Sequence, residues 1–210
     1  MTALALFGAY LLGSIPFAIL VSRVMGLPDP RGFGSGNPGA TNVLRSGSRL
    51  GALLTLLGDS SKGAVAVLLG RLMAERAGLD PGLAAWCGAC AFLGHLFPFT
   101  LRFRGGKGVA TFLGTLIALM PLLGAIACGT WLAMAAVFRF SSLAAVTSCI
   151  VAAAAAWVLD AGSATALAAT GMSAMLLLRH RSNISNLLAG RETRIGQQRK
   201  PGTAGEAGPR

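Results

Sequence analysis

The chain has 210 residues, of which 54% are hydrophobic and 12% are charged. An ordinary soluble domain carries about 25% charged residues, so this composition argues against a water-soluble globule, and the apolar content excludes a disordered chain. The formal net charge is +11, but the basic residues lie in short islands between long apolar runs. That placement is typical of the cytoplasmic loops of membrane proteins, and we expect no nucleic-acid partner.

Six uncharged or nearly uncharged runs follow along the chain: 3–22, 50–70, 83–101, 109–138, 140–159 and 161–178. The first run lacks the basic flank and the cleavage site of a signal peptide, so we interpret it as a spanning helix. As one helix, the run 109–138 would be about 45 Å long, against a hydrocarbon core of about 30 Å. Because Pro121 and Gly124 lie near its middle, it is either one long kinked helix or two short helices.

The charges of the connecting loops distinguish these alternatives. Basic residues follow the first and third runs, whereas the loop after the second run balances Arg71 and Arg76 with Glu75 and Asp80. The first and third connections are therefore expected to be cytoplasmic and the second external. The basic C-terminal region is cytoplasmic too only if 109–138 crosses twice. The sequence thus predicts an all-α integral membrane protein, a seven-transmembrane-helix bundle with short fourth and fifth helices, an external N-terminus and a cytoplasmic C-terminus.

Residues 1–200 are expected to form a single domain, and 201–210, rich in Gly, Ala and Pro, a disordered tail. Cys87 and Cys90 form a C-x-x-C pattern inside the run 83–101. With no second cysteine pair nearby, we interpret them as small residues of a spanning helix. No clustered carboxylate pair is present for a metal ion, and we expect no metal site.

The first polar island, residues 34–45, reads GSGNPGATNVLR. Asn37 and Pro38 are a good N-cap and first-turn pair, so a short helix is expected to begin at Pro38 and to end at Ser46-Gly47. Its N-terminus suits a phosphate group, and the glycines let a ligand approach the backbone. An ordinary glycine-rich turn is the alternative, but the concentration of Ser, Asn, Thr and Arg favours a binding function.

The second island contains GHLFPF at 94–99 and RFRGGKGVAT at 102–111. Gly105-Gly106-Lys107-Gly108 opens the fourth predicted helix, and consecutive N–H groups beside a lysine favour an anion nest. A positive-inside anchor would explain the arginines but not the glycines. Leu101 stands where the leading glycine of a P-loop would be, so nucleotide hydrolysis is unsupported.

Further polar residues stand at the ends of, or within, the apolar runs. His180 and Asn183 are three residues apart and would share a helical face. Asp59 and Lys62, within the second run, are expected to form a structural ion pair that supports the site, because charges inside a membrane are usually paired or functional. Ser142 begins the sixth predicted helix, where it could also be a simple N-cap.

Three anion-binding loops on one face of a helical bundle indicate a phosphate-bearing substrate, and grooves between helices could hold an acyl chain. A base of the H-x4-D type is absent, since Thr100 and Ser185 stand five residues after the two histidines. No nucleophile elbow is present either. An enzyme of this kind needs an activated donor and relies on positioning and charge neutralisation.

At this point the sequence resembles a known family. GSIPF at 13–17, GSGNPGATNV at 34–43, GHLFP at 94–98, GGKGVAT at 105–111 and RHRSNI at 179–184 are similar, in this order, to the motifs of the PlsY family. The resemblance runs from about residue 8 to about residue 195. The family consists of bacterial membrane acyltransferases that use acyl phosphate and glycerol-3-phosphate.

The resemblance implies transfer of a fatty acyl group from acyl phosphate to the 1-hydroxyl of glycerol-3-phosphate, giving lysophosphatidic acid and phosphate, the first acylation of phospholipid synthesis. It implies a multi-pass protein of the bacterial cytoplasmic (inner) membrane whose polar cavity faces the cytoplasm. It also implies no cofactor, no covalent enzyme intermediate and contact with membrane lipids. We expect a monomer.

The resemblance also implies a set of site residues. Catalytic roles fall on Ser35, Arg45, Lys107, Ser142, His180 and Asn183, which would surround glycerol-3-phosphate, with Arg45 and Lys107 neutralising phosphate. Substrate-binding roles fall on Gly36, Asn37, Gly39, Ala40, Thr41, Asn42, His95, Gly105, Gly106 and Gly108. Residues 39–42 would line the donor phosphate site, chiefly through backbone N–H groups, and His95 would orient the second island.

Two other functions stay open on the residues alone. A transporter of a phosphate-bearing solute would need polar residues along a path through the membrane, and the external side offers few of them. A lipid-binding protein without turnover would tolerate substitution of Ser35 and Lys107.

Overall fold

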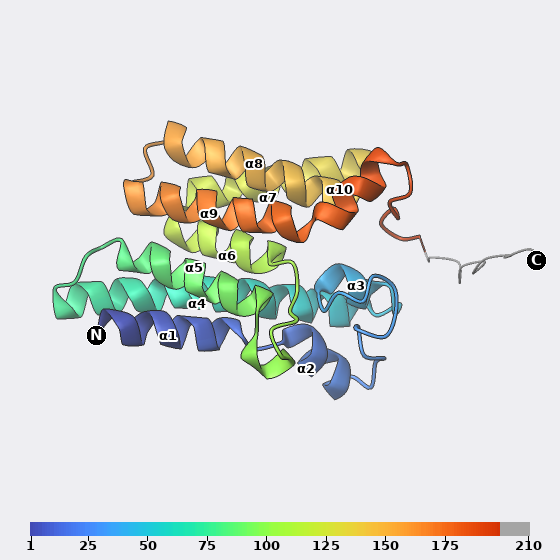
Figure 1. Cartoon of the computed structure of the whole chain (residues 1–210), viewed down its shortest axis with the longest axis horizontal. Helices are drawn as coiled ribbons and strands as arrows, with labels where there is room; N and C mark the ends of the chain where they lie inside the picture. Colours follow the sequence, from blue (N-terminus) through green and yellow to red (C-terminus); the bar gives the residue numbers. More distant parts are fainter. Residues whose placement is uncertain (198–210) are drawn as a thin grey trace, which may run out of the picture.

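The computed structural model describes residues 1–197, and all regular structure in this range is helical (Figure 1). In chain order the helices are α1 (Thr2–Gly13), α2 (Phe17–Val24), α3 (Ala40–Leu44), α4 (Arg49–Ala77), α5 (Leu83–Leu96), the 3-10 turn η1 (Phe99–Leu101), α6 (Val109–Leu119), α7 (Pro121–Phe138), α8 (Ser141–Val158), α9 (Ser163–Arg179) and α10 (Arg181–Leu188). The expected tail at 201–210 lies outside the described residues.

Four stretches of the described chain are long and apolar enough to cross a membrane: α4, the stretch Leu83–Leu101, α7 and α8. The bent pair α1 and α2 makes a fifth candidate. Large apolar side chains point outward along these helices, such as Leu57 and Leu68 on α4 and Leu132 on α7. Outward apolar faces on helices suit a lipid environment, so the prediction of an all-α membrane protein is confirmed at this level.

The sequence predicts one spanning helix for the first apolar run, and this prediction is wrong. The run forms two helices that meet at an angle of 40°. Pro16 lacks an N–H group and disfavours helical geometry at the residue before it, so α1 ends at Gly13 and α2 begins at Phe17. The break frees backbone carbonyls, and side chains from other helices satisfy two of them. Thr100 Oγ1 donates to Ser14 O at 3.0 Å, and Lys62 Nζ donates to Ile15 O at 3.0 Å.

The run 109–138 forms two helices that are divided at Met120, which is the second of the two alternatives given by the sequence. The two parts are unequal, because Pro121 occupies the first turn of α7 and leaves 11 residues in α6 and 18 in α7. The expectation that both would be short is therefore wrong for α7. Figure 1 shows the pair folding back as a hairpin, and a Cβ at Gly124 would overlap the backbone of Ile117.

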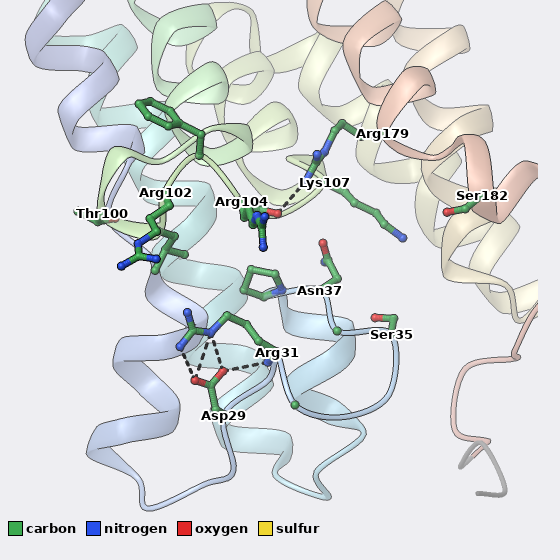
Figure 2. Close-up of a pocket in the computed structure, with 16 residues that line it drawn as sticks. Asp29, Arg31, Ser35, Asn37, Thr100, Arg102, Arg104, Lys107, Arg179 and Ser182 are labelled. Atoms are coloured by element: carbon green, nitrogen blue, oxygen red, sulfur yellow. Dashed lines mark hydrogen bonds and ion pairs between the residues drawn. The ribbon is translucent and has the colours of Figure 1, made fainter. Parts of the chain in front are cut away.

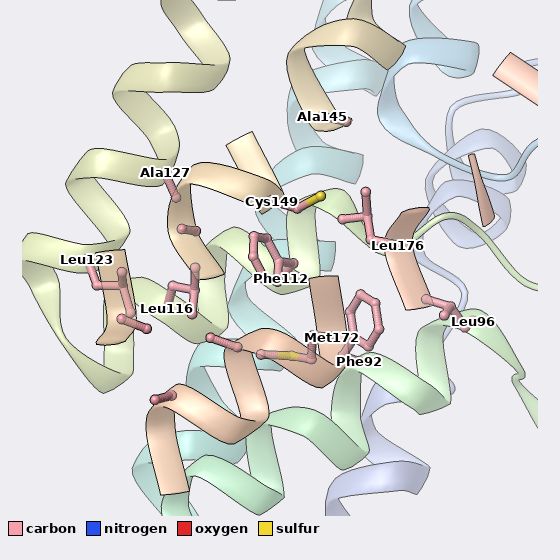
Figure 3. Packing of buried hydrophobic residues seen from close by; sticks show 14 residues of the cluster. Phe92, Leu96, Phe112, Leu116, Leu123, Ala127, Ala145, Cys149, Met172 and Leu176 are labelled. Atoms are coloured by element: carbon pink, nitrogen blue, oxygen red, sulfur yellow. The ribbon is translucent and has the colours of Figure 1, made fainter. Parts of the chain in front are cut away.

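Helix α6 joins two groups of helices, since it packs on α4 and α5 on one side and on α7 and α9 on the other (Figure 1). The main apolar core lies here and includes Phe92, Phe112, Leu123, Cys149 and Leu176 from five different helices (Figure 3). Glycines allow helices α1 and α5 to approach closely, because a Cβ at Gly13 would overlap Ala91 and one at Gly94 would overlap Tyr10.

The packing gathers the polar islands at one end of the bundle. Figure 1 shows α2, α3, the loop after α5 and α10 together at the right-hand end of the molecule. Helix α3 contacts α4 and α2, and α10 contacts α8 and α9. The three islands, far apart in the sequence, therefore lie at the same end of the bundle (Figure 1).

Candidate active site

An open cavity of about 1070 Å³ lies between the first and second islands and the end of α9 (Figure 2). Five cationic side chains line it, together with one carboxylate: Arg31, Arg102, Arg104, Lys107, Arg179 and Asp29. The Asp29 carboxylate is already paired with Arg31 at 2.6 Å, and the Arg31 guanidinium lowers its pKa. The cavity therefore carries a net positive charge that suits an anionic ligand.

Of the site residues expected from the sequence, Ser35, Gly36, Asn37, Gly105 and Lys107 line this cavity. Figure 2 shows the Lys107 side chain extending into the space above Asn37 and Ser35. Burial lowers the pKa of Lys107 below its usual value; the Glu192 carboxylate opposes this shift, and the positive charges of Arg45 and Arg179 add to it. A bound anion would relieve this repulsion, so the arrangement favours an anionic ligand over an empty site.

Lys107 also begins a chain of polar contacts that leads to the C-terminal segment. Its Nζ donates to Asn183 Oδ1 at 2.5 Å, and Asn183 Nδ2 donates to Glu192 Oε1 at 2.7 Å. Ser142 Oγ donates to the same carboxylate oxygen at 2.7 Å. Asn183 and Ser142 thus meet at Glu192, and Lys107 joins them through Asn183. Ser142 is not an N-cap, because Phe140 holds that position of α8.

His180 lies at the junction of α9 and α10, where it is buried. Its Nδ1 lies 2.9 Å from Leu176 O. Burial lowers the pKa of His180 to about 4, with a further lowering from the charge of Lys107, so the imidazole is neutral at physiological pH. A neutral ring held by a backbone carbonyl is suited to hydrogen bonding and not to charge neutralisation.

The first island folds around the Asn42 side chain. Asn42 Oδ1 accepts from Ser35 N at 3.0 Å, and Nδ2 donates to Pro30 O at 2.6 Å. The whole residue is buried and its N–H donates to Gly39 O at 2.9 Å, so Asn42 holds the island together from within. The short helix begins at Ala40 and not at Pro38 as expected, because Gly39, in extended geometry, takes the N-cap position.

Other residues of this island connect it to the remaining site. Thr41 Oγ1 lies 3.1 Å from Ser141 Oγ at the start of α8. Arg45 Nη1 lies 3.4 Å from Asn42 Oδ1, and its charge acts on Lys107. Gly39 and Ala40 stand at the N-terminal end of α3, at the edge of the same end of the bundle.

The glycines of the second island are held against other backbone groups. Gly105 N donates to Leu96 O, and Gly106 N donates to His95 O, each at 3.1 Å. These two N–H groups are therefore not available to the expected anion nest, which would have to use groups further along the loop. Arg179 fixes the same loop from α9, because its Nη2 donates to Gly105 O at 2.9 Å and to Gly106 O at 3.1 Å. Gly108, with φ of 87°, caps α6.

The expected ion pair between Asp59 and Lys62 is present and buried, with Lys62 Nζ 2.8 Å from Asp59 Oδ1. His95 joins it, since its Nδ1 lies 3.3 Å from the same oxygen. His95 does not line the large cavity but lies beneath the loop that carries Lys107.

Sequence reasoning missed the positions of Glu192 and Arg179. Both belong to a stretch rich in arginine that is readily interpreted as a membrane anchor. The only sequence signal for Glu192 is that it is an isolated acidic residue within this stretch.

The sequence of this chain matches one known family over most of its length. The family model described as "Glycerol-3-phosphate acyltransferase" matches residues 3–190. A glycerol-3-phosphate acyltransferase of Thiobacillus denitrificans is 52% identical over 190 residues, which cover 90% of this chain and 95% of the relative. One of Laribacter hongkongensis is 54% identical over 192 residues, which cover 91% and 95%.

The fold of this chain is also similar to solved structures of this kind of enzyme. The crystal structure of PlsY, an integral membrane glycerol 3-phosphate acyltransferase, in its glycerol 3-phosphate form, superposes with a TM-score of 0.85 at 35% identity and covers 93% of this chain and 96% of that one. Its lysophosphatidic acid form gives a TM-score of 0.84 at 34% identity, with 93% and 95% covered. Because the family model and the curated relatives span nearly the whole chain, this protein belongs to the glycerol-3-phosphate acyltransferase family of membrane enzymes that act in phospholipid synthesis.

Proposed function

We propose that this enzyme transfers a fatty acyl group from acyl phosphate to the 1-hydroxyl of glycerol-3-phosphate, giving lysophosphatidic acid and phosphate. The observation that carries the proposal is the cationic cavity, which opens beside the polar chain formed by Lys107, Asn183, Glu192 and Ser142. The cations match an acceptor and a donor that are both phosphate-bearing.

The choice of donor follows from what the site offers as a base. His95 Nδ1 is engaged by Asp59, and His180 Nδ1 by the Leu176 carbonyl. Within residues 1–197, neither histidine is hydrogen-bonded to a serine or cysteine side chain, so no histidine-activated nucleophile is assembled there, and the Ser142 hydroxyl donates instead to the Glu192 carboxylate. An acyl phosphate is a mixed anhydride with a good leaving group, and its reaction needs little basic assistance. Direct transfer without a covalent enzyme intermediate suits this site.

In the proposed step, the oxygen of the 1-hydroxyl attacks the acyl carbonyl carbon and forms the new ester bond. The bond from that carbon to the phosphate oxygen breaks, and inorganic phosphate leaves with the electron pair. The hydroxyl proton passes to a phosphate oxygen of glycerol-3-phosphate. The protein contributes orientation and stabilises the negative charge that develops on the leaving phosphate.

Roles for individual residues follow their positions. Lys107 and Arg45 would neutralise phosphate, while Ser35, Ser142, His180 and Asn183 would orient glycerol-3-phosphate by hydrogen bonds. Asn37, Ala40 and Thr41 would hold the donor phosphate through the backbone at the edge of α3. Gly36, Gly39 and Asn42 would shape this loop, because their N–H groups donate to Phe33 O, Asn37 O and Gly39 O. Gly105, Gly106 and Gly108 would act by letting the Lys107 loop approach α5.

We further propose seven membrane crossings, counting α1 with α2 as one, then α4, α5, α6, α7, α8 and α9. The N-terminus would be external, and the cavity and C-terminus would face the cytoplasm across the inner membrane of a bacterium, in a monomeric enzyme. The support is the concentration of basic residues at the end of the bundle that carries the cavity.

The test is phosphate release by the purified protein in detergent, with palmitoyl phosphate as donor and with or without glycerol-3-phosphate. Palmitoyl-CoA serves as the parallel donor. Release that depends on glycerol-3-phosphate and matches lysophosphatidate formation is the expected result. Product from palmitoyl-CoA alone would overturn the donor. Release of one phosphate per protein without acceptor, with the palmitoyl group left covalently attached to the protein, would overturn direct transfer.

A further inference from the structure

We propose that Asp59, Lys62 and His95 are positioning residues that set the height and orientation of the Lys107 loop over the cavity. This inference rests on the proposed function, because it assigns to these residues the placement of a phosphate-binding group. None of the three lines the large cavity, so their effect must pass through other atoms.

The three side chains connect the break between α1 and α2 to the Lys107 loop by way of helices α4 and α5. Lys62 Nζ contacts Asp59 Oδ1 at 2.8 Å and donates to Ile15 O, a carbonyl freed by the break between α1 and α2, at 3.0 Å. Asp59 Oδ1 lies 3.3 Å from His95 Nδ1 on α5. The cluster therefore ties the helix break to α4 and α5 by charged contacts, which have stricter geometry than apolar packing.

The other face of His95 supports the Lys107 loop. Gly106 packs directly on the imidazole, since a Cβ there would overlap the ring, and Gly106 N donates to His95 O at 3.1 Å. Lys107 is the next residue along the chain. A shift of the His95 ring would therefore move the Lys107 backbone, whose side chain reaches the cavity.

The cluster has no room for a ligand. It borders a void of about 10 Å³, which holds at most one water molecule. Pro38 of the first island and Gly105 of the second also line this void, so the cluster lies beneath both islands. A buried ion pair is a weak source of net stability, because desolvation offsets much of the attraction between the charges. The contacts thus serve the placement of the two islands more than the stability of the bundle.

Charge-balanced substitution separates positioning from stability. Lys62→Met leaves an unpaired carboxylate in the interior and should lower the thermal unfolding midpoint in detergent. Asp59→Leu combined with Lys62→Met removes both charges and should recover most of that midpoint. In the double variant we expect KM for glycerol-3-phosphate, at saturating palmitoyl phosphate, to stay raised by about tenfold, with kcat changed much less.

A double variant that recovers both the midpoint and the wild-type KM would overturn the proposal. If that variant does not fold, His95→Gln tests the same connection with the ion pair intact: a raised KM supports the proposal and an unchanged KM overturns it. Leu123→Ala, in the apolar core, is the matched control for destabilisation and should lower the midpoint without changing KM. A raised KM in this control as well would attribute the effect to general loosening and overturn the proposal.

Failure of the proposed function is distinguishable from failure of this inference. In the first case the wild-type protein itself would form no lysophosphatidate, whereas in the second only the comparison of variants would change.

Discussion

Replacement of Lys107 by alanine tests the central charge of the site. Lys107 Nζ reaches Asn183 at 2.5 Å, in a cavity where burial and two arginines lower the pKa of the lysine. A bound phosphate would favour the charged form of the lysine, because an opposite charge nearby stabilises the ammonium group. A hydrogen bond to a charged group in such a site is worth roughly 3 kcal/mol in the transition state, so Lys107→Ala should lower kcat/KM by about a hundredfold.

The assay is the initial rate of phosphate release from palmitoyl phosphate across a series of glycerol-3-phosphate concentrations, with lysophosphatidate measured in parallel. Arg76→Ala removes one positive charge from an exposed position in the last turn of α4 and should behave as wild type. Lys107→Arg keeps the charge but changes its shape and should retain intermediate activity. Wild-type kcat/KM in correctly folded Lys107→Ala would refute the placement of the site.

Three further predictions follow from single residues. Arg45→Ala should also lower turnover by about a hundredfold, and His95→Ala by less, because only Arg45 is expected to touch phosphate; similar losses in both variants would contradict these roles. Glu192→Ala leaves Asn183 Nδ2 and the Ser142 hydroxyl without their acceptor and should cost about 1–3 kcal/mol in unfolding free energy, measured by chemical or thermal denaturation, whereas Glu192→Gln should lose less. The pKa of His180 is about 4 in the fold and 6.5 in a free histidine, so the unfolded chain binds more protons between these values and stability falls as pH decreases through this window. The unfolding midpoint of wild type should therefore fall more steeply from pH 7 to pH 4.5 than that of His180→Gln; parallel curves would contradict burial of a neutral imidazole.

Much of the architecture could be predicted from local sequence properties. The apolar runs identified a helical membrane protein, and Pro121 located the division between α6 and α7 because proline has no N–H group to continue a helix. The same effect at Pro16 is harder to predict, because a long apolar run conceals a break whose carbonyls are satisfied by distant side chains. Helix lengths were less predictable, because the end of a helix depends on capping contacts as well as on hydropathy.

For the proposed site, the sequence alone indicates which residue types and islands are candidates, because motif identity and charge are local properties of the chain. The ion pair of Asp59 with Lys62 was also predictable, since both lie on one helix three residues apart. Tertiary structure decided which groups meet. Only the packing of α8 against α10 brings Ser142 to Glu192, only the approach of α5 places His95 beside Asp59, and only the fold of the second island commits the Gly105 and Gly106 N–H groups to backbone carbonyls. These contacts join residues far apart in the chain, and their geometry is set by how helices pack, a property that no single segment of the sequence contains.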